Sequence, residues 1–254
     1  MFLFFAFAGT QVANINANSG ASASTTNAAT GFSPIVLTYI SLSFGFSLMV
    51  NVWIFYRISG GLFNPAVTLG MVMVKSLSYT RGILLCGAQI VGSIITSLIV
   101  KVLFPVDFNV RTTLSEDTSL VQGVFIEGLL TAELVFAIFM LAKEKHRATY
   151  LAPIGIGIAL FIAELVGVYY TGGSLNPARS FGPCVVTGIW DKEHWIYWVG
   201  PCCGAIGAVG FYNFIKVLEY EMANPGQDSA SEQKAEKEAE QYKNKKDEGR
   251  NDMV

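Results

Sequence analysis

Two nine-residue segments of this chain read almost alike: SGGLFNPAV at residues 59–67 and, 112 positions later, TGGSLNPAR at residues 171–179. Both hold a Gly-Gly pair, which permits a tight turn, and then an Asn, which caps helices well. The Pro that follows suits the first helical position because its missing N–H is not needed there. An apolar run comes next in each copy, at residues 67–74 and 180–186. Each segment therefore predicts a short helix that begins just after the Asn.

Long apolar stretches surround both segments. A membrane-spanning helix needs about 20 mostly apolar residues, and five stretches meet this length: 34–56, 82–104, 121–142, 151–170 and 195–218. Residues 1–12 are as apolar but barely half as long, and we expect them to form a shortened first span.

Each repeated segment then lies between the second and third span of its half. Because three spans make up each half, the two halves cross the membrane in opposite senses. The sequence predicts an all-α membrane protein of six transmembrane helices, the first one short, with two re-entrant half-helices. The inverted three-span repeats cover about residues 1–104 and 121–218.

Composition supports this interpretation. The chain is 52% apolar and 14% charged, whereas about a quarter of the residues of an average soluble domain are charged. Ten acidic and six basic side chains fall in residues 219–254, which leaves 20 charges for the first 218 residues. The formal net charge of −2 gives no basic surface for nucleic acid. We expect a transmembrane channel domain at residues 1–218 and a charged, flexible tail at residues 219–254.

Basic residues in short loops indicate the orientation, because such loops face the cytoplasm. Two connections carry them: Arg57, Lys75 and Arg81 in one, and Lys143, Lys145 and Arg147 in the other. With six crossings, both termini and the tail are then cytoplasmic. We expect a multi-pass integral protein of the plasma membrane or an internal membrane.

Two half-helices that begin in mid-membrane suit a pore. Interrupted helices at that depth are tolerated where protein buries them or water lines them. Facing N-termini focus positive potential at the centre, which repels cations. They also present the side-chain amides of Asn64 and Asn176 to a passing molecule.

The chain resembles the aquaporins, the major intrinsic protein family, over about residues 1–218. The paired Asn-Pro-Ala boxes with shared flanks carry the resemblance: Asn64, Pro65, Ala66, Asn176, Pro177 and Ala178. The resemblance implies a homotetramer in the lipid bilayer, with one pore per subunit. Each pore passes water or small neutral solutes in single file, without protons and without a cofactor. Asn64 and Asn176 donate hydrogen bonds to the central water and so break a proton wire.

The same resemblance implies a selectivity filter made of Phe44, Glu164, Gly173 and Arg179. Arg179 is the hydrogen-bond donor and cation barrier, and Phe44 is the aromatic wall. Glu164 and Gly173 match neither the water-selective nor the glycerol-conducting branch. A buried carboxylate is costly in a membrane, so Glu164 needs a partner, which is either Arg179 or the N–H groups of residues 171–175.

Other positions favour the water-selective branch, namely Ser180 after the Arg and the pair Tyr197-Trp198 in the last span. The resemblance implies that Glu133, inside the fourth span, braces the neighbouring re-entrant loop. Glu127, near the beginning of the same span, is expected at the interface. The counterpart of Glu133 in the first half would precede Met1. Together with the short first span, this suggests that the N-terminal part of the first helix is missing.

Three functions remain open at this point: a water channel, a broader facilitator of solutes such as glycerol or hydrogen peroxide, and a non-conducting adhesion or sensor protein. An enzyme is not indicated, because Gly172-x-Ser174-x-Asn176 lacks the second glycine of a nucleophile elbow. A metal centre is not expected either, because no two of the four cysteines are spaced as Cys-x-x-Cys and the two histidines, His146 and His194, lie in a charged loop and beside Trp195.

Overall fold

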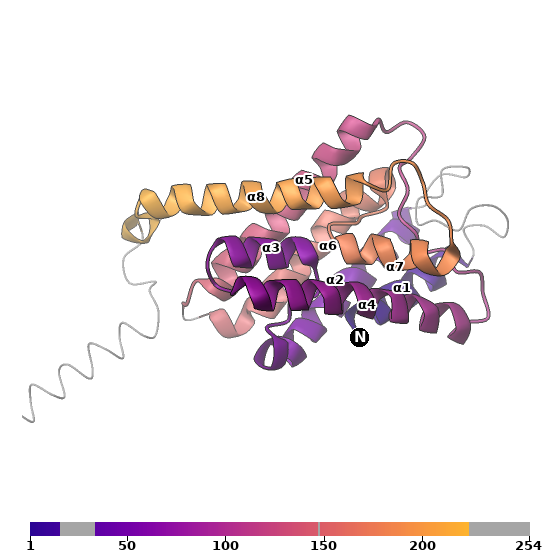
Figure 1. Cartoon of the computed structure of the whole chain (residues 1–254), viewed down its shortest axis with the longest axis horizontal. Helices are drawn as coiled ribbons and strands as arrows, with labels where there is room; N and C mark the ends of the chain where they lie inside the picture. The colour runs from indigo at the N-terminus through magenta and orange to yellow at the C-terminus, as the bar shows by residue number, and fades with distance from the viewer. Residues whose placement is uncertain (16–33, 147, 224–254) are drawn as a thin grey trace, which may run out of the picture.

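The computed structural model describes residues 1–15, 34–146 and 148–223 (Figure 1). The first half of the chain forms α1 (Phe2–Asn14), α2 (Pro34–Ser59), α3 (Pro65–Met73) and α4 (Tyr79–Leu103). The second half forms α5 (Leu120–Ile138), α6 (Ala152–Thr171), α7 (Pro177–Thr187) and α8 (Ile196–Val217). Short helical turns follow α5 (Phe139–Lys143), precede α6 (Thr149–Leu151) and follow α8 (Tyr220–Ala223). Most of the predicted polar loop and of the tail lies outside the described residues.

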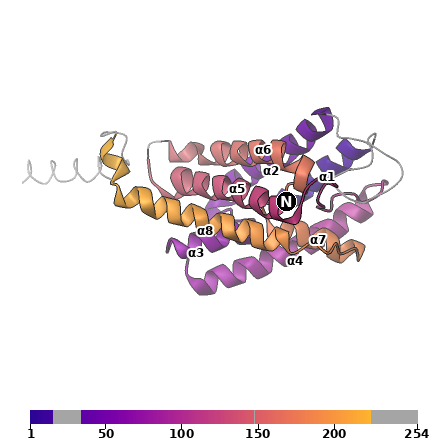
Figure 2. The same ribbon diagram turned by 90° about the horizontal axis from the view of Figure 1, so that it is seen from above.

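The predicted fold class is confirmed. Five of these helices are long and apolar enough to cross a membrane, and α1 is a shorter apolar helix. Each half runs helix, helix, short helix, helix, as an internal repeat requires. Figures 1 and 2 both show α3 and α7 in line along the long axis of the molecule, beside α4 and α8.

The two halves pack crosswise around the short helices. The α2 helix lies against α6, and α5 lies against α8. The short helix α3 contacts α8, and α7 contacts α4, so each short helix packs against the last long helix of the other half. The α2–α6 contact is close at two facing glycines, because a Cβ on Gly45 would lie 2.9 Å from the carbonyl oxygen of Gly157. Small residues permit such close helix crossings in membranes.

Candidate functional site

Both short helices begin at an Asn cap. Asn64 and Asn176 are in extended conformation, each with φ of −146°, and a Pro occupies the first turn after each. The Oδ1 atom of Asn64 accepts a hydrogen bond from the Ala66 N–H at 2.8 Å, and Oδ1 of Asn176 accepts one from the Ala178 N–H at 3.0 Å. These bonds satisfy N–H groups that a helix start otherwise leaves without a partner.

The two caps are also tied to each other's loops. Nδ2 of Asn64 donates to the carbonyl of Leu175 at 2.7 Å, and Nδ2 of Asn176 donates to the carbonyl of Phe63 at 2.9 Å. Each acceptor is the residue just before the opposite Asn. A side-chain amide carries two N–H groups, so within the described residues each Asn keeps one N–H for a molecule beside it.

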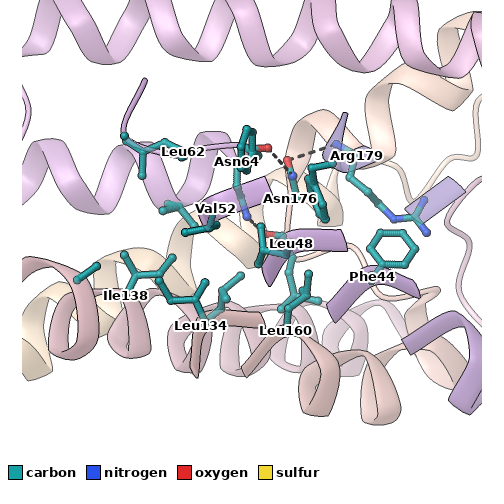
Figure 3. A pocket seen from close by; sticks show the side chains of 18 of the residues that line it. Phe44, Leu48, Val52, Leu62, Asn64, Leu134, Ile138, Leu160, Asn176 and Arg179 are labelled. Atoms are coloured by element: carbon teal, nitrogen blue, oxygen red, sulfur yellow. Dashed lines mark hydrogen bonds between the residues drawn. The ribbon is translucent and has the colours of Figure 1, made fainter. Parts of the chain in front are cut away.

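A narrow cavity passes both Asn side chains. Its space for water-sized molecules is about 70 Å³, which suits a short file of waters. Phe44, Glu164 and Arg179 line one end, which we call the filter end, and Tyr56 and Ala142 line the other. Figure 3 shows Asn64 and Asn176 between the Phe44–Arg179 pair and the apolar wall residues Leu62 and Ile138.

Arg179 is fully buried at the filter end. Its Nε donates to the Gly173 carbonyl at 3.1 Å, and its terminal nitrogens donate to the carbonyls of Val110 and Gly172. The guanidinium carbon lies 4.9 Å from the centre of the Phe44 ring and 5.4 Å from that of Phe7. A cation over an aromatic face is attracted by the ring, so these contacts fix the orientation of Arg179.

At the filter end, the Glu164 side chain lies directly against Gly173. Glu164 is fully buried, and neither of its oxygens accepts a hydrogen bond from any described residue. The expected hydrogen bonds to Glu164 from Arg179 or from the N–H groups of residues 171–175 are therefore absent among the described residues, although the Arg179 charge is close enough to attract the Glu164 carboxylate. Gly173 has φ of 61°, and a Cβ on it would collide with Oε2 of Glu164. The Glu164 carboxyl thus fills the position that a side chain at residue 173 would take.

The prediction that Glu133 supports the second re-entrant loop is wrong, because Glu127 accepts the hydrogen bonds from that loop. Glu127 is fully buried, and it accepts hydrogen bonds from the N–H groups of Ser174 at 2.9 Å and Leu175 at 2.7 Å. The hydroxyl of Thr171 donates to it at 2.6 Å. Glu133, six residues on, lies on the exposed face of α5. Six residues are about 1.7 helical turns, which rotate a side chain to another face.

Helical phase could have identified Glu127 from the sequence. The buried residues of α5 recur every three or four positions: Gly123, Glu127, Thr131, Leu134, Val135 and Ile138. Glu127 is on that stripe and Glu133 is not. The filter contacts from Phe7 and Val110 were also missed, because Phe7 lies in the short first helix and Val110 takes part through its carbonyl, which no side-chain pattern reports.

No group of three or more His, Cys, Asp or Glu side chains in the described part of the chain is placed to hold a metal ion. The polar side chains that line the cavity carry amide, carboxyl, guanidinium and hydroxyl groups, the hydroxyls being those of Tyr56 and Ser174. This arrangement can exchange hydrogen bonds with a passing molecule at two levels, the filter and the Asn pair.

The chain is similar in sequence to known proteins. The chain is 72% identical over 228 residues to Aquaporin-5 of Botryotinia fuckeliana (strain B05.10), which covers 90% of this chain and 42% of that protein. It is 70% identical over 229 residues to Probable aquaporin-5 of Gibberella zeae (strain ATCC MYA-4620 / CBS 123657 / FGSC 9075 / NRRL 31084 / PH-1), again covering 90% of this chain and 42% of that one. The chain thus spans less than half the length of these two curated relatives.

A solved structure and a family model extend the comparison. The X-ray structure of the aquaglyceroporin from Plasmodium falciparum matches with a TM-score of 0.66 and 20% identity, covering 83% of this chain and 90% of that chain, which supports the fold alone. The family model described as Major intrinsic protein matches residues 1–212. The chain therefore belongs to the major intrinsic protein family, the family of the aquaporins.

Proposed function

We propose that this chain forms a passive channel that conducts water down osmotic gradients and excludes ions and protons. The observation that carries the proposal is the narrow cavity that passes both Asn side chains where the N-termini of α3 and α7 meet. Its wall is mainly apolar, with Leu48, Val67 and Leu160 among the lining residues.

The proposed mechanism follows from where the donors lie. An apolar wall offers water no competing hydrogen bonds, so a file of waters is held at the Asn pair and at Arg179. Amide N–H groups at the centre orient the water there with its oxygen toward the two Asn residues. Its hydrogens then point away along the file in both directions, which interrupts proton transfer. The positive ends of the two half-helices and the Arg179 charge oppose cation entry.

A second candidate, a broader facilitator of small neutral solutes, is favoured by Glu164. Three of the Arg179 donors are engaged by backbone carbonyls, whereas Glu164 lines the cavity and its buried oxygens have no described hydrogen-bond partner. A solute that donates hydrogen bonds would find acceptors there. This second candidate differs from the first only in selectivity, so the same preparation distinguishes them.

The test is stopped-flow light scattering on liposomes that contain the purified chain, under separate water and glycerol gradients. We expect water permeability well above that of empty liposomes. Equal rates in loaded and empty liposomes would contradict channel activity. Glu164→His should lower the glycerol-to-water ratio if Glu164 lines the path. An unchanged ratio together with reduced thermal stability would assign Glu164 a structural role.

We further propose that four copies assemble, with both termini and the tail at residues 219–254 in the cytoplasm. Large apolar side chains cover the outer faces of α2, α4 and α8, as lipid or neighbouring subunits require. Light scattering of the detergent-solubilised protein after gel filtration should give a protein mass of four chains, and a monomeric mass would contradict the assembly.

A further inference from the structure

The loop between α4 and α5 contains a segment, residues 107–112, that we call the strap. Two side chains of α1 hold its first part: Nε2 of Gln11 donates to the Asp107 carbonyl at 3.0 Å, and Nδ2 of Asn14 donates to the Asn109 carbonyl at 3.3 Å. Both side chains are buried. The strap is therefore attached to the first half of the molecule on this side.

The second part of the strap contacts the filter end. The Val110 carbonyl accepts a hydrogen bond from Arg179, and the Thr112 hydroxyl donates to Oγ of Ser180 at 2.8 Å. Thr112 also packs on the turn before the second box, since a Cβ on Gly172 would lie 3.0 Å from the Thr112 Cα. Val110 and Thr112 thus both touch the segment that carries Arg179.

Arg111, between these two residues, makes a different contact. Its guanidinium forms an ion pair with Asp191, in the loop after α7, and the two side chains are 6% and 23% exposed. The pair joins the strap to the far end of α7, the helix whose first turn holds Arg179. A buried ion pair is weak evidence for stability, because removing the charges from water is costly. The ion pair does, however, fix the position of the strap relative to the loop after α7.

We propose that the Arg111–Asp191 ion pair is a positioning device for the filter. The ion pair holds the strap in place, and the Val110 carbonyl of the strap then fixes the Arg179 guanidinium. The pair thereby influences which solutes pass the filter, although it does not contact the solutes itself. This inference rests on the proposed channel function. A guanidinium that loses one of its anchors shifts, and a shift of about 1 Å matters where donors must meet a permeant molecule.

The experiment compares four variants of the full chain in liposomes. Asp191→Asn removes the negative charge at constant size, and Asp191→Glu keeps it. The double variant Arg111→Gln with Asp191→Asn removes both charges, so no buried charge is left unpaired. Lys101→Gln is the matched control, because Lys101 donates to the Val186 carbonyl at 3.2 Å and so also joins α4 to α7, but it is exposed and its described bond does not involve the strap.

Water and glycerol permeability are measured by stopped flow for each variant. We expect Asp191→Asn and the double variant to raise the glycerol-to-water ratio at least about threefold, while Asp191→Glu and Lys101→Gln keep the ratio of the parent. A merely structural role would lower the yield or stability and leave the ratio unchanged, and that result would overturn the proposal.

Failure of the channel function is recognised separately, because the parent would then conduct no faster than empty liposomes. Hydrogen–deuterium exchange of residues 105–114 and 172–180 decides the positioning claim in that case. Faster exchange of both segments in Asp191→Asn, but not in Lys101→Gln, would support the claim. Unchanged exchange in both variants would refute it.

Discussion

The two box loops share a sequence pattern but differ in how the protein holds them. The first loop, residues 59–64, is partly exposed, and Gln89 of α4 holds it by donating to the Leu62 carbonyl at 2.6 Å. The second loop, residues 171–176, is buried throughout. Glu127 accepts three hydrogen bonds from it, and the Tyr197 hydroxyl donates to the Thr171 carbonyl at 2.8 Å.

The second loop also holds a strained residue. Leu175 has φ of 49°, a left-handed conformation that costs a non-glycine residue about 1–2 kcal/mol. Its N–H is bound by Glu127 and its carbonyl by Asn64, so the surroundings enforce this geometry. Such strain persists only where neighbours fix it. The comparison teaches that the repeat encodes the helix start, whereas packing buries the loop on the filter side and leaves the other loop more exposed.

Removing the brace of the second loop should have the largest effect. Glu127→Ala leaves the N–H groups of Ser174 and Leu175 buried without an acceptor, at a cost of about 2–6 kcal/mol. We expect the free energy of unfolding, measured by SDS titration in mixed micelles, to fall by that amount.

The corresponding change in the first loop should cost less. Gln89→Ala affects a loop that water can reach, so we expect a loss of about 1 kcal/mol. Glu133→Gln is the control on α5, and its effect should stay within about 0.5 kcal/mol. Equal losses for Glu127→Ala and Gln89→Ala would show that the two loops are held equally, against our interpretation.

The second glycine of the Gly-Gly pair before each Asn-Pro-Ala box allows a further comparison of the two loops. Gly61 and Gly173 have φ of 66° and 61°, so a side chain at either costs about 1–2 kcal/mol. The two glycines differ in the room around them. A Cβ on Gly61 would lie 3.4 Å from the Val52 Cα, whereas one on Gly173 would collide with Glu164. Thermal unfolding should therefore show Gly173→Ala to be less stable than Gly61→Ala.

The same collision couples Gly173 to Glu164. We expect Glu164→Ala to relieve much of the cost of Gly173→Cys, and the double variant to bind mercurials at the filter end and lose water permeability. The parent should respond weakly to low doses. Strong inhibition of the parent would mean that one of its own cysteines reaches the pore.

The smallest effect concerns charges at the end of the cavity near Tyr56. Partial burial disfavours the charged form of Glu144, but hydrogen bonds from Tyr212 and Lys216 and the charges of Lys216 and Lys143 outweigh it and hold the pKa of Glu144 below its ordinary value. Stability from a lowered carboxyl pKa is present above the unfolded pKa of about 4.3 and is lost as pH falls through the folded pKa.

Glu144→Gln should therefore cost at most about 1 kcal/mol at pH 7, and its difference from the parent should vanish in acid. High salt should shrink that difference, whereas the Arg111–Asp191 pair, in which the Arg111 side chain is 6% exposed, should respond less. SDS titrations at several pH values and salt concentrations measure both effects. A difference that persists below the folded pKa would contradict the assignment.

Local sequence signals predicted most of the fold. Apolar length located the spans within a few residues, and the Gly-Gly-Asn-Pro-Ala pattern located both short helices. The candidate site was predicted less completely. The prediction at Glu133 rests on the family resemblance and on the depth of this residue in the span, whereas helical phase indicates Glu127. The Val110 carbonyl binds Arg179 across 69 residues of sequence, and the lack of a described hydrogen-bond partner for Glu164 depends on its three-dimensional surroundings. Both follow from tertiary packing and not from local pattern.

The most direct test of the account is whether water follows the cavity between the boxes. Leu48 lines this cavity, while Val50, two residues along α2, is 52% exposed on the outer face. Water permeability of reconstituted Leu48→Trp and Val50→Trp is compared by stopped flow, after gel filtration has shown that both are folded. We predict that Leu48→Trp falls to the level of empty liposomes and that Val50→Trp stays near the parent. A folded Leu48→Trp variant that conducts like the parent would contradict the account.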